Sequence, residues 1–266
     1  MFKFGENWVS FSRSIDETRI EEAKQSLKKL FGEGAFSGKS FLDIGCGSGL
    51  FSIAAAQLGA RSVLGLDVDP ISVATSQSNA AHWLKSPSSI SFRQLSILDG
   101  EQMNQLGTFD IVYSWGVLHH TGNMKVALHN AGQRVAPNGM LMIAIYNKHW
   151  SSGVWKVIKW VYNRVGSWVQ KILIWILTPV IFLAKWLVTF RNPFRMQRGM
   201  DFMHNVIDWV GGYPYEYASI AEMSAALENI GFERLAVFPA KVPTGCNEFV
   251  CRKTAASAGY FHNETS

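Results

Sequence analysis

Short apolar runs alternate with helical segments along the middle of the chain. Five runs of five to seven residues, bounded by glycine, proline or polar residues, have the pattern of buried strands. One helix is expected to begin at Leu50, and another at Pro70 with Asp69 as its N-cap. This alternation predicts a parallel sheet with helices on both faces. The expected strands are 40–44, 62–66, 90–95, 109–113 and 139–145, the last preceded by a turn at 136–139.

Both ends of the chain add elements to this sheet. Ser14 and Glu17 form a capping-box pattern that opens a helix near the N-terminus. Its expected apolar face consists of Ile20, Ala23, Leu27 and Leu30. A second capping box, at 219–222, opens a helix that is followed by strands at 234–238 and 248–252. The short link between these strands is rich in Pro and Gly, which predicts an antiparallel hairpin at the sheet edge.

The predicted fold class is α/β: a doubly wound, mostly parallel seven-stranded sheet with an antiparallel last strand and a helical cap insertion. Four segments are expected. They are an N-terminal lead-in and helix (1–39), a Rossmann-like body (40–149 and 216–253), an aromatic and basic helical cap (150–215) and a small polar tail (254–266).

The cap segment differs in composition from the rest of the chain. Seven of the ten tryptophans lie within 150–215, interleaved with Lys and Arg. Residues 172–190 carry one charge, Lys185, and approach the length of a membrane span. A single crossing would separate the last helix and strands from their sheet, so helices lying at an interface are expected instead. Three roles stay open: a cap over the acceptor site, a membrane-surface contact through 150–200, and a dimer interface.

Composition and charge narrow the class of protein. The chain has 266 residues, 48% of them hydrophobic, and a net charge of +5. This composition excludes a disordered or collagen-like chain. The basic residues lie among aliphatic ones, which favours a membrane surface over nucleic acid as a partner. Three cysteines in no paired spacing, and an N-terminus without a continuous apolar core, predict a cytoplasmic protein at most peripheral to the inner membrane face.

One motif carries the chemistry. An apolar strand runs into Asp43, and glycines at 45, 47 and 49 lead into the next helix. Glycine permits the tight turn and the close approach of a ligand to the backbone, and the helix N-terminus offers free N–H groups. The dinucleotide fingerprint requires a glycine or alanine at the sixth position, where Leu50 stands, so NAD and FAD are disfavoured. Asp67 ends the next strand, where doubly wound folds place the carboxylate that binds ribose hydroxyls.

The sequence resembles the class I S-adenosylmethionine-dependent methyltransferases. The resemblance rests on DIGCGSG (43–49), GLDVD (65–69), QLSILD (94–99), FDIVYSWGVLHHTG (109–122) and RVAPNGMLMIAIYN (134–147), which occur in the family's order. Within the family, the combination of WGVLHHTG, YN, DWVGGYP and GCNEF is similar to a bacterial subgroup that methylates quinones and small molecules.

The resemblance implies a cofactor site for S-adenosylmethionine. The methionine part would lie along the glycine turn, the ribose hydroxyls on Asp67, and the adenine against Val68. Ser96 stands where many relatives have Asp for the adenine amino group. Trp8 could cover the cofactor or simply pack on the first helix. The implied cofactor contacts are Trp8, Asp43, Gly45, Cys46, Gly47, Asp67, Val68, Ser96, Ile97, Ser114 and Trp115.

The acceptor site is expected at the carboxyl ends of the fourth and fifth strands. A hydroxyl acceptor needs a base, and His120 or His119 could serve, although one of them could instead bond a backbone group. Tyr146 is a further candidate catalytic residue. The sequence contains no tight cluster of metal-ligand residues, so the expected reaction needs no metal. The expected acceptor contacts are His119, Tyr146, Asn147, Asn247 and Glu248.

The predicted activity is methyl transfer from S-adenosylmethionine to an oxygen atom of a small, apolar or lipid-linked acceptor. Ser-Trp-Gly-Val follows the fourth strand instead of the motif that resembling enzymes use on nucleobase or amide nitrogens, which argues against a DNA methylase. Two alternatives stay open: C-methylation of a quinol-like ring, and S-adenosylmethionine binding without catalysis. An oligomer also stays open.

Overall fold

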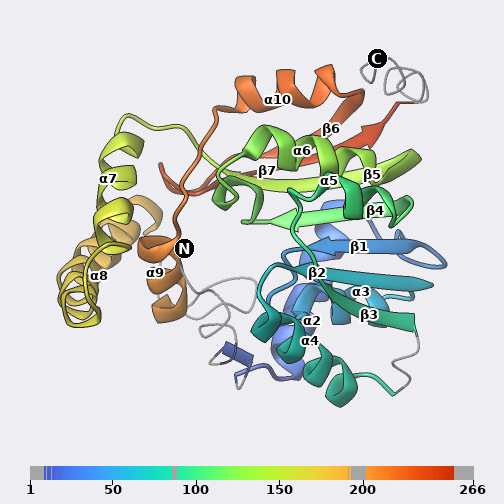
Figure 1. Cartoon of the computed structure of the whole chain (residues 1–266), viewed down its shortest axis with the longest axis horizontal. Helices are drawn as coiled ribbons and strands as arrows, with labels where there is room; N and C mark the ends of the chain where they lie inside the picture. The colour runs from blue at the N-terminus through green and yellow to red at the C-terminus, as the bar shows by residue number, and fades with distance from the viewer. Residues whose placement is uncertain are drawn as a thin grey trace.

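A single twisted sheet forms the centre of the molecule. The computed structural model describes residues 9, 11–12, 14–85, 89–190, 192 and 202–254. The sheet has seven strands in the order β3-β2-β1-β4-β5-β7-β6 (Figure 1). The first five run parallel, and β7 is antiparallel to both β5 and β6, which confirms the predicted fold class. The strands are β1 (Ser40–Ile44), β2 (Ser62–Asp67), β3 (Ile90–Gln94), β4 (Phe109–Trp115), β5 (Val135–Tyr146), β6 (Phe232–Phe238) and β7 (Cys246–Lys253).

Helices cover both faces of this sheet. One apolar core lies under α2 (Glu17–Phe31), α3 (Leu50–Gln57) and α4 (Pro70–Trp83). The other lies under α5 (Gly100–Asn104), α6 (Met124–Gln133) and α10 (Ile220–Asn229). Because both faces are covered, all five residues of the central strand β1 are buried.

Two local predictions were wrong. The first helix begins at Glu17 with Asp16 as its N-cap, because the Asp16 side chain accepts from the N–H of Arg19 while the hydroxyl of Ser14 donates to Phe11. The expected turn at 136–139 lies within β5 as an irregularity of the ladder, with Asn138 at φ +60°. The predicted apolar face of α2, the N-cap of α4 and the capping box of α10 are confirmed.

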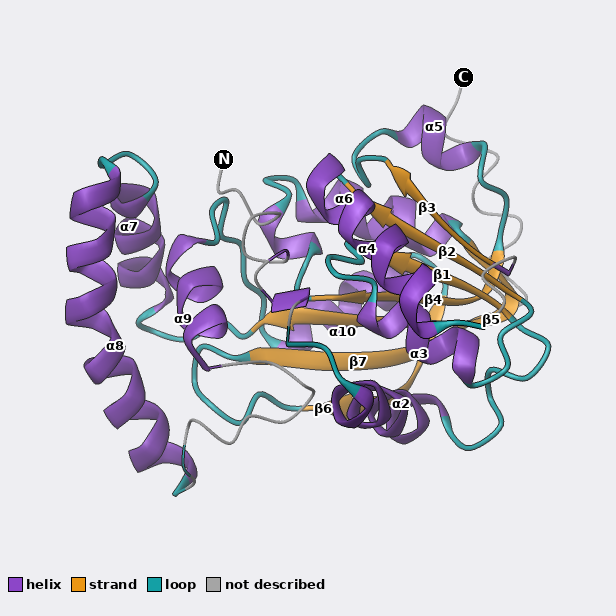
Figure 2. Ribbon diagram, turned by 90° about the horizontal axis from the view of Figure 1, so that it is seen from below, coloured by secondary structure: helices purple, strands orange, loops and turns teal. Residues whose placement is uncertain are grey.

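Three helices project from one end of the sheet and are called the cap here: α7 (Ser152–Tyr162), α8 (Ser167–Thr189) and α9 (Phe202–Gly211) (Figure 2). They share a small core of their own, in which Tyr162, Phe202, Val206 and Val210 are buried. Among the described residues, α8 is the one helix long and apolar enough to cross a membrane, and its most apolar window is not buried.

The chain before α8 and the chain after it belong to the same sheet. β5 precedes the cap and pairs with β7, which follows it, from Met140–Arg252 to Tyr146–Cys246. α8 also packs through Leu173, Ile174 and Leu177 against the cap core, three of whose four buried residues belong to α9. The segments before and after α8 therefore lie on the same side of a membrane that the cap would contact.

Candidate active site

A cavity of about 2150 Å³ lies where β1, β2, β4 and β5 end, between the sheet and the cap. The strand order reverses between β1 and β4, and open α/β sheets bind ligands at such a point. Sites for one small molecule are typically about 300–1,000 Å³. The cavity therefore has room for a cofactor and a second molecule.

The glycine turn after β1 forms one wall of the cavity. The N–H groups of Gly45 and Cys46 both donate to the carbonyl of Leu66, at 2.7 and 2.9 Å, which holds the turn against the end of β2. Gly45 has φ +74°, and a Cβ there would lie 2.3 Å from Cγ2 of Val117. Only glycine fits this position. Burial holds the pKa of the Cys46 thiol well above its usual value, so Cys46 contributes a neutral side chain.

Asp67 joins this turn to the start of α4. One carboxylate oxygen accepts from the N–H of Gly47 at 3.0 Å, and the other accepts from the N–H of Asp69 at 2.9 Å. Burial raises the pKa of this carboxyl, and the backbone N–H groups oppose the shift. Each carboxylate oxygen has further acceptor capacity, which suits a pair of adjacent hydroxyls. Val68 beside it lines the cavity with its side chain half exposed.

Asp43 lies deeper in the same wall. Its side chain is buried, and one oxygen accepts from the hydroxyl of Ser52 at 2.6 Å. Burial raises its pKa to about 7, and the charge of Asp67 adds to the shift. A cationic group bound beside these carboxylates would lower both pKa values and would be attracted by both. Two carboxylates, a glycine turn and an adjacent apolar surface fit a ligand with a cation, a diol and an aromatic base, as in S-adenosylmethionine.

Ser96 and Ile97 line the cavity after β3. The hydroxyl of Ser96 accepts from the N–H of Leu98 in its own loop, and the carbonyl of Ile97 accepts from the amide of Asn130. These bonds fix the loop on the side of the cavity where the resemblance expects the adenine.

The structure places other expected cofactor contacts differently. Ser114 is fully buried and its hydroxyl donates to the carbonyl of Ile44, so its side chain does not line the cavity. The N–H of Gly47 is directed to Asp67 rather than toward a ligand. Trp8 lies outside the described residues.

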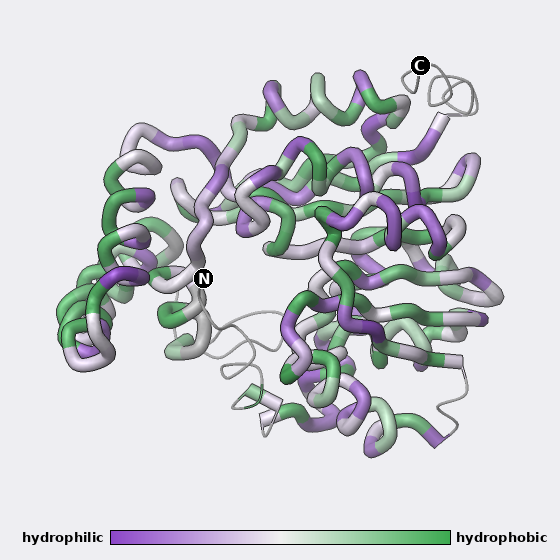
Figure 3. The backbone as a smooth tube through the Cα atoms, in the orientation of Figure 1, coloured by the Kyte–Doolittle hydropathy of each residue, from purple (hydrophilic) through white to green (hydrophobic). Residues whose placement is uncertain are grey.

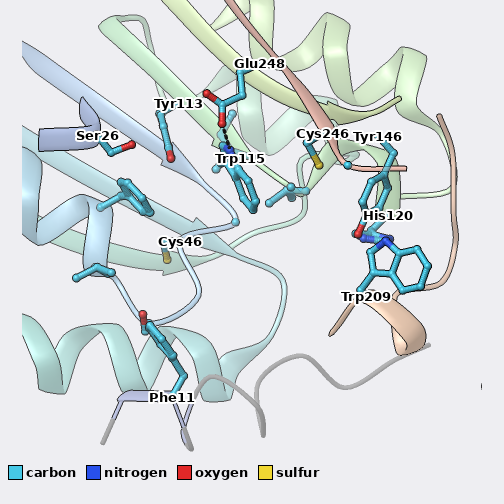
Figure 4. Close-up of a pocket in the computed structure, with 18 of the residues that line it drawn as sticks. Phe11, Ser26, Cys46, Tyr113, Trp115, His120, Tyr146, Trp209, Cys246 and Glu248 are labelled. Atoms are coloured by element: carbon cyan, nitrogen blue, oxygen red, sulfur yellow. Dashed lines mark hydrogen bonds between the residues drawn. The ribbon is translucent and has the colours of Figure 1, made fainter. Parts of the chain in front are cut away.

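The opposite end of the cavity is aromatic. Trp115, His120, Tyr146, Trp155 and Trp209 line it, and the close-up in Figure 4 shows Tyr146, His120 and Trp209 side by side. The indole N–H of Trp115 donates to the carboxylate of Glu248 at 3.0 Å. Glu248, expected as an acceptor contact, therefore also orients the ring of Trp115.

The two histidines have different surroundings. His119 is fully buried, accepts from the N–H of Tyr146 at Nδ1 and does not line the cavity. Burial holds its pKa well below the usual value. Its surroundings are those of a packing residue, because no part of it reaches the acceptor end.

His120 lies in the cavity wall. Its Nδ1 is 2.7 Å from the carbonyl of Pro214, and because a carbonyl only accepts, Nδ1 carries the hydrogen and Nε2 the lone pair. Burial lowers its pKa to about 3, with a smaller contribution from the charge of Lys159. The imidazole is therefore neutral near pH 7.

Two expected acceptor contacts, Asn147 and Asn247, do not line the cavity. The Asn147 amide donates to the carbonyl of Pro243, and the Asn247 amide donates to Asn147 at 3.0 Å. Asn247 also accepts from the N–H of Ala240. Because their polar groups bond one another and the loop between β6 and β7, they hold that loop against the end of β5.

Sequence reasoning missed Lys159, a basic residue of α7 that is fully buried. It donates to the carbonyl of Trp209, and its ammonium lies 5.5 Å from the ring of Tyr146, 4.9 Å from that of Trp209 and 4.8 Å from that of Tyr215. Tyr146 and Trp209 line the cavity, so the ammonium of Lys159 lies next to the aromatic rings that form the wall of the acceptor end. Nothing in the local pattern separates Lys159 from Lys156, the exposed lysine of the same helix.

A family model described as a methyltransferase domain matches residues 15–236, more than four-fifths of the chain. The chain belongs to this methyltransferase family. The predicted methyltransferase family is thereby confirmed.

Curated relatives of this methyltransferase include enzymes named ubiquinone biosynthesis O-methyltransferase. One, from Rhodopseudomonas palustris, is 28% identical over 166 residues, which are 60% of this chain and 60% of the relative. Another, from Azorhizobium caulinodans, is 29% identical over 167 residues, 58% of this chain and 63% of the relative. The match thus spans less than two-thirds of the length of these relatives.

Solved structures share the fold. The magnesium protoporphyrin IX methyltransferase of Synechocystis PCC 6803 with bound S-adenosylmethionine has a TM-score of 0.55 at 15% identity, over 88% of this chain and 79% of that one. An O-methyltransferase family protein from Burkholderia thailandensis has a TM-score of 0.55 at 11% identity, over 89% of this chain and 57% of that one. At such identities the likeness shows the fold alone.

Proposed function

We propose that the protein transfers the methyl group of S-adenosylmethionine to a hydroxyl oxygen of a small, largely apolar acceptor that is linked to a lipid. The observation that carries this proposal is one continuous cavity with two chemically different ends: Asp43 and Asp67 at one, and an aromatic wall with a neutral histidine at the other.

The carboxylate end would hold the cofactor. Asp43 would attract the methionine ammonium, Asp67 would accept from both ribose hydroxyls, and Val68 would pack on the adenine. The methionine part would lie along the glycine turn, where Gly45 lines the cavity and Val117 occupies the place that a side chain at 45 would need. When bound, the cofactor supplies a methyl group on a cationic sulfur, which leaves as a neutral thioether.

The aromatic end would hold the acceptor. His120 Nε2 would accept the hydroxyl proton while the O–CH₃ bond forms and the S–CH₃ bond breaks, so protons and charge balance. Trp115 and Tyr146 would confine the acceptor ring and exclude water, and alignment of oxygen, methyl and sulfur would supply much of the rate. Burial keeps His120 neutral near pH 7 and also makes it a weak base. The proton would therefore move to Nε2 only as the O–CH₃ bond forms, because methylation makes the hydroxyl strongly acidic.

An apolar acceptor fits the cap side of the cavity. Trp155, Ile181, Val206 and Trp209 line it there. The names of the relatives support an oxygen acceptor on a quinol-like precursor. The protein would then act in the cytoplasm, with the cap in contact with the inner membrane surface.

The test is a methyl-transfer assay with catechols and quinols of increasing alkyl chain length. We expect O-methylated products, at least a tenfold gain in kcat/KM for the longer chains, and at least a hundredfold lower kcat in His120→Gln. His129→Gln, a histidine of α6 outside the cavity, is the matched control.

Other outcomes would contradict the proposal. NMR of the product assigns the methylated atom, and methylation at ring carbon would establish the C-methyltransferase alternative instead. Tight binding of S-adenosylhomocysteine without transfer to any acceptor would establish a binding protein. Binding of NAD without S-adenosylhomocysteine would refute the cofactor assignment.

A further inference from the structure

α8 has two apolar faces with different surroundings. One face packs in the cap core through Leu173, Leu177 and Ile181. The other exposes large side chains at positions that a helix of 3.6 residues per turn brings to one side, within a sector of about 120°. These outer-face residues are Trp168, Ile172, Trp175, Ile176, Leu183 and Trp186. Figure 2 shows α8 side-on as a long helix at the edge of the molecule, and Figure 3, which views this region nearly end-on, colours much of it hydrophobic.

The exposed face is too large to be incidental. Trp175 is 79% exposed, and on α7, which contacts α8, the side chains of Val154, Val157 and Trp160 are exposed as well. Large exposed apolar patches on soluble proteins mark surfaces that bind something. The outer face of α7 and α8 is therefore a candidate docking surface.

Its charge identifies the partner. Residues 150–190 contain five basic residues and no acidic one. Lys156, Arg164 and Lys171 are exposed among the tryptophans, and Arg164 lies 3.9 Å from the ring of Trp160. Basic residues beside tryptophan suit a helix lying in an anionic lipid interface. A second copy would bring like charges together, which disfavours a symmetric dimer through this face.

The same helix forms the rim of the active-site cavity. Val180 and Val188 line the cavity and are 55% and 48% exposed. Ala184, one turn from each, is exposed and also lines it. The cavity therefore reaches the surface beside the docking face, past small apolar side chains.

We propose that α7 and α8 dock on an anionic membrane surface and that the acceptor passes from the lipid into the cavity beside α8, along Val180, Ala184 and Val188. This inference rests on the proposed function, because it concerns how the lipid-linked acceptor reaches that site. An apolar tail would thereby stay out of water throughout its transfer.

The experiment uses the full chain and vesicles of phosphatidylcholine with or without phosphatidylglycerol. Flotation measures docking, and methyl transfer is measured on a long-chain quinol in the vesicles and on a short-chain quinol in solution. The test variant is Trp168→Ser/Trp175→Ser/Trp186→Ser, whose residues do not line the cavity. The charge variant is Lys156→Glu/Lys171→Glu. Leu235→Ser and Lys85→Glu, exposed on the body, are the matched controls.

We expect the wild type to float with anionic vesicles, and each cap variant to bind them at least tenfold more weakly. Turnover of the vesicle-borne quinol should fall at least tenfold in both variants, while turnover of the soluble quinol stays within twofold. Unchanged flotation, equal binding to neutral vesicles, or a dimer that the tryptophan changes dissociate would overturn the inference. If the wild type floats but methylates neither quinol, the proposed function fails and docking stands.

Discussion

The sheet body and the cap bury apolar side chains in different ways. In the body, helices cover both faces, so β1 and residues 141–146 of β5 are buried throughout. In the cap, α8 buries one face in a small core and leaves the other exposed. The body buries its apolar side chains in two cores of its own, whereas the cap leaves an apolar surface exposed.

The polar chemistry is divided in the same way. The body contributes Asp43 and Asp67, held by Ser52 and by backbone N–H groups. The cap contributes aromatic walls and the buried charge of Lys159. Changes at these carboxylates of the body should therefore affect the cofactor, and changes in the cap should leave cofactor affinity unchanged.

The largest effect is expected at the glycine turn. Gly45→Ala should lower the free energy of unfolding by about 3 kcal/mol or more, because the new Cβ would clash with Val117 at a strained φ. Gly107→Ala is the matched control, with φ +73° but no neighbour within 4 Å, and should cost about 1 kcal/mol. Urea unfolding measures both. Equal losses would mean that the contact with Val117 contributes nothing.

The second effect concerns the cofactor alone. Asp67→Asn should weaken S-adenosylhomocysteine about 100-fold, equivalent to about 2.7 kcal/mol, because two bonds to a charged acceptor are lost. Asp69→Asn, a neighbour that also lines the cavity, should change affinity less than threefold because Asn still caps α4. Isothermal calorimetry checks both, and an unchanged affinity in Asp67→Asn would refute the ribose assignment.

The third prediction tests whether a change in the cap leaves the cofactor site of the body unaffected. Lys159→Met should lower the free energy of unfolding by about 2 kcal/mol through loss of the bond to Trp209 and of three cation–π contacts. It should also raise the pKa of His120, because a nearby positive charge is removed. Affinity for S-adenosylhomocysteine should stay within twofold.

Lys156→Met, on the exposed side of α7, is the control and should leave both properties unchanged. Thermal unfolding measures the stability, and NMR of labelled histidine measures the pKa of His120. A cofactor affinity that falls together with stability in Lys159→Met would break the division between cap and body.

The smallest effect is a pH dependence. Asp43 has a pKa of about 7, so it is mostly protonated at pH 6 and mostly ionised at pH 8. Affinity for cationic S-adenosylmethionine should therefore be about tenfold weaker at pH 6 than at pH 8. The stability that this raised pKa gives the cofactor-free protein is present below pH 3.8 and is lost as the pH rises toward 7.

Asp43→Asn should bind S-adenosylmethionine with a flat profile over the same range, because the titrating group is absent. Calorimetry at several pH values tests this. A wild-type affinity that does not change between pH 6 and pH 8 would show that Asp43 does not interact with the ammonium.

The sequence by itself determined the sheet, its strand count and the carboxylate end of the cavity. Strand and helix periodicity, glycines at 45, 47 and 49, and an acid at the end of β2 are signals within a few residues. Each of these signals reflects a requirement of the local backbone. Together they predict one fold, because a parallel sheet must be covered by helices on both faces.

The tertiary structure decided which side chains meet. Trp115 and Glu248 are 133 residues apart, and His120 and Pro214 are 94 apart. His120 lies in the cavity wall, whereas His119, directly before it, is buried away from the cavity. Lys159 is buried, whereas Lys156 of the same helix is exposed. Such differences depend on which elements pack against each face of a helix or loop, and no periodicity along the chain records that.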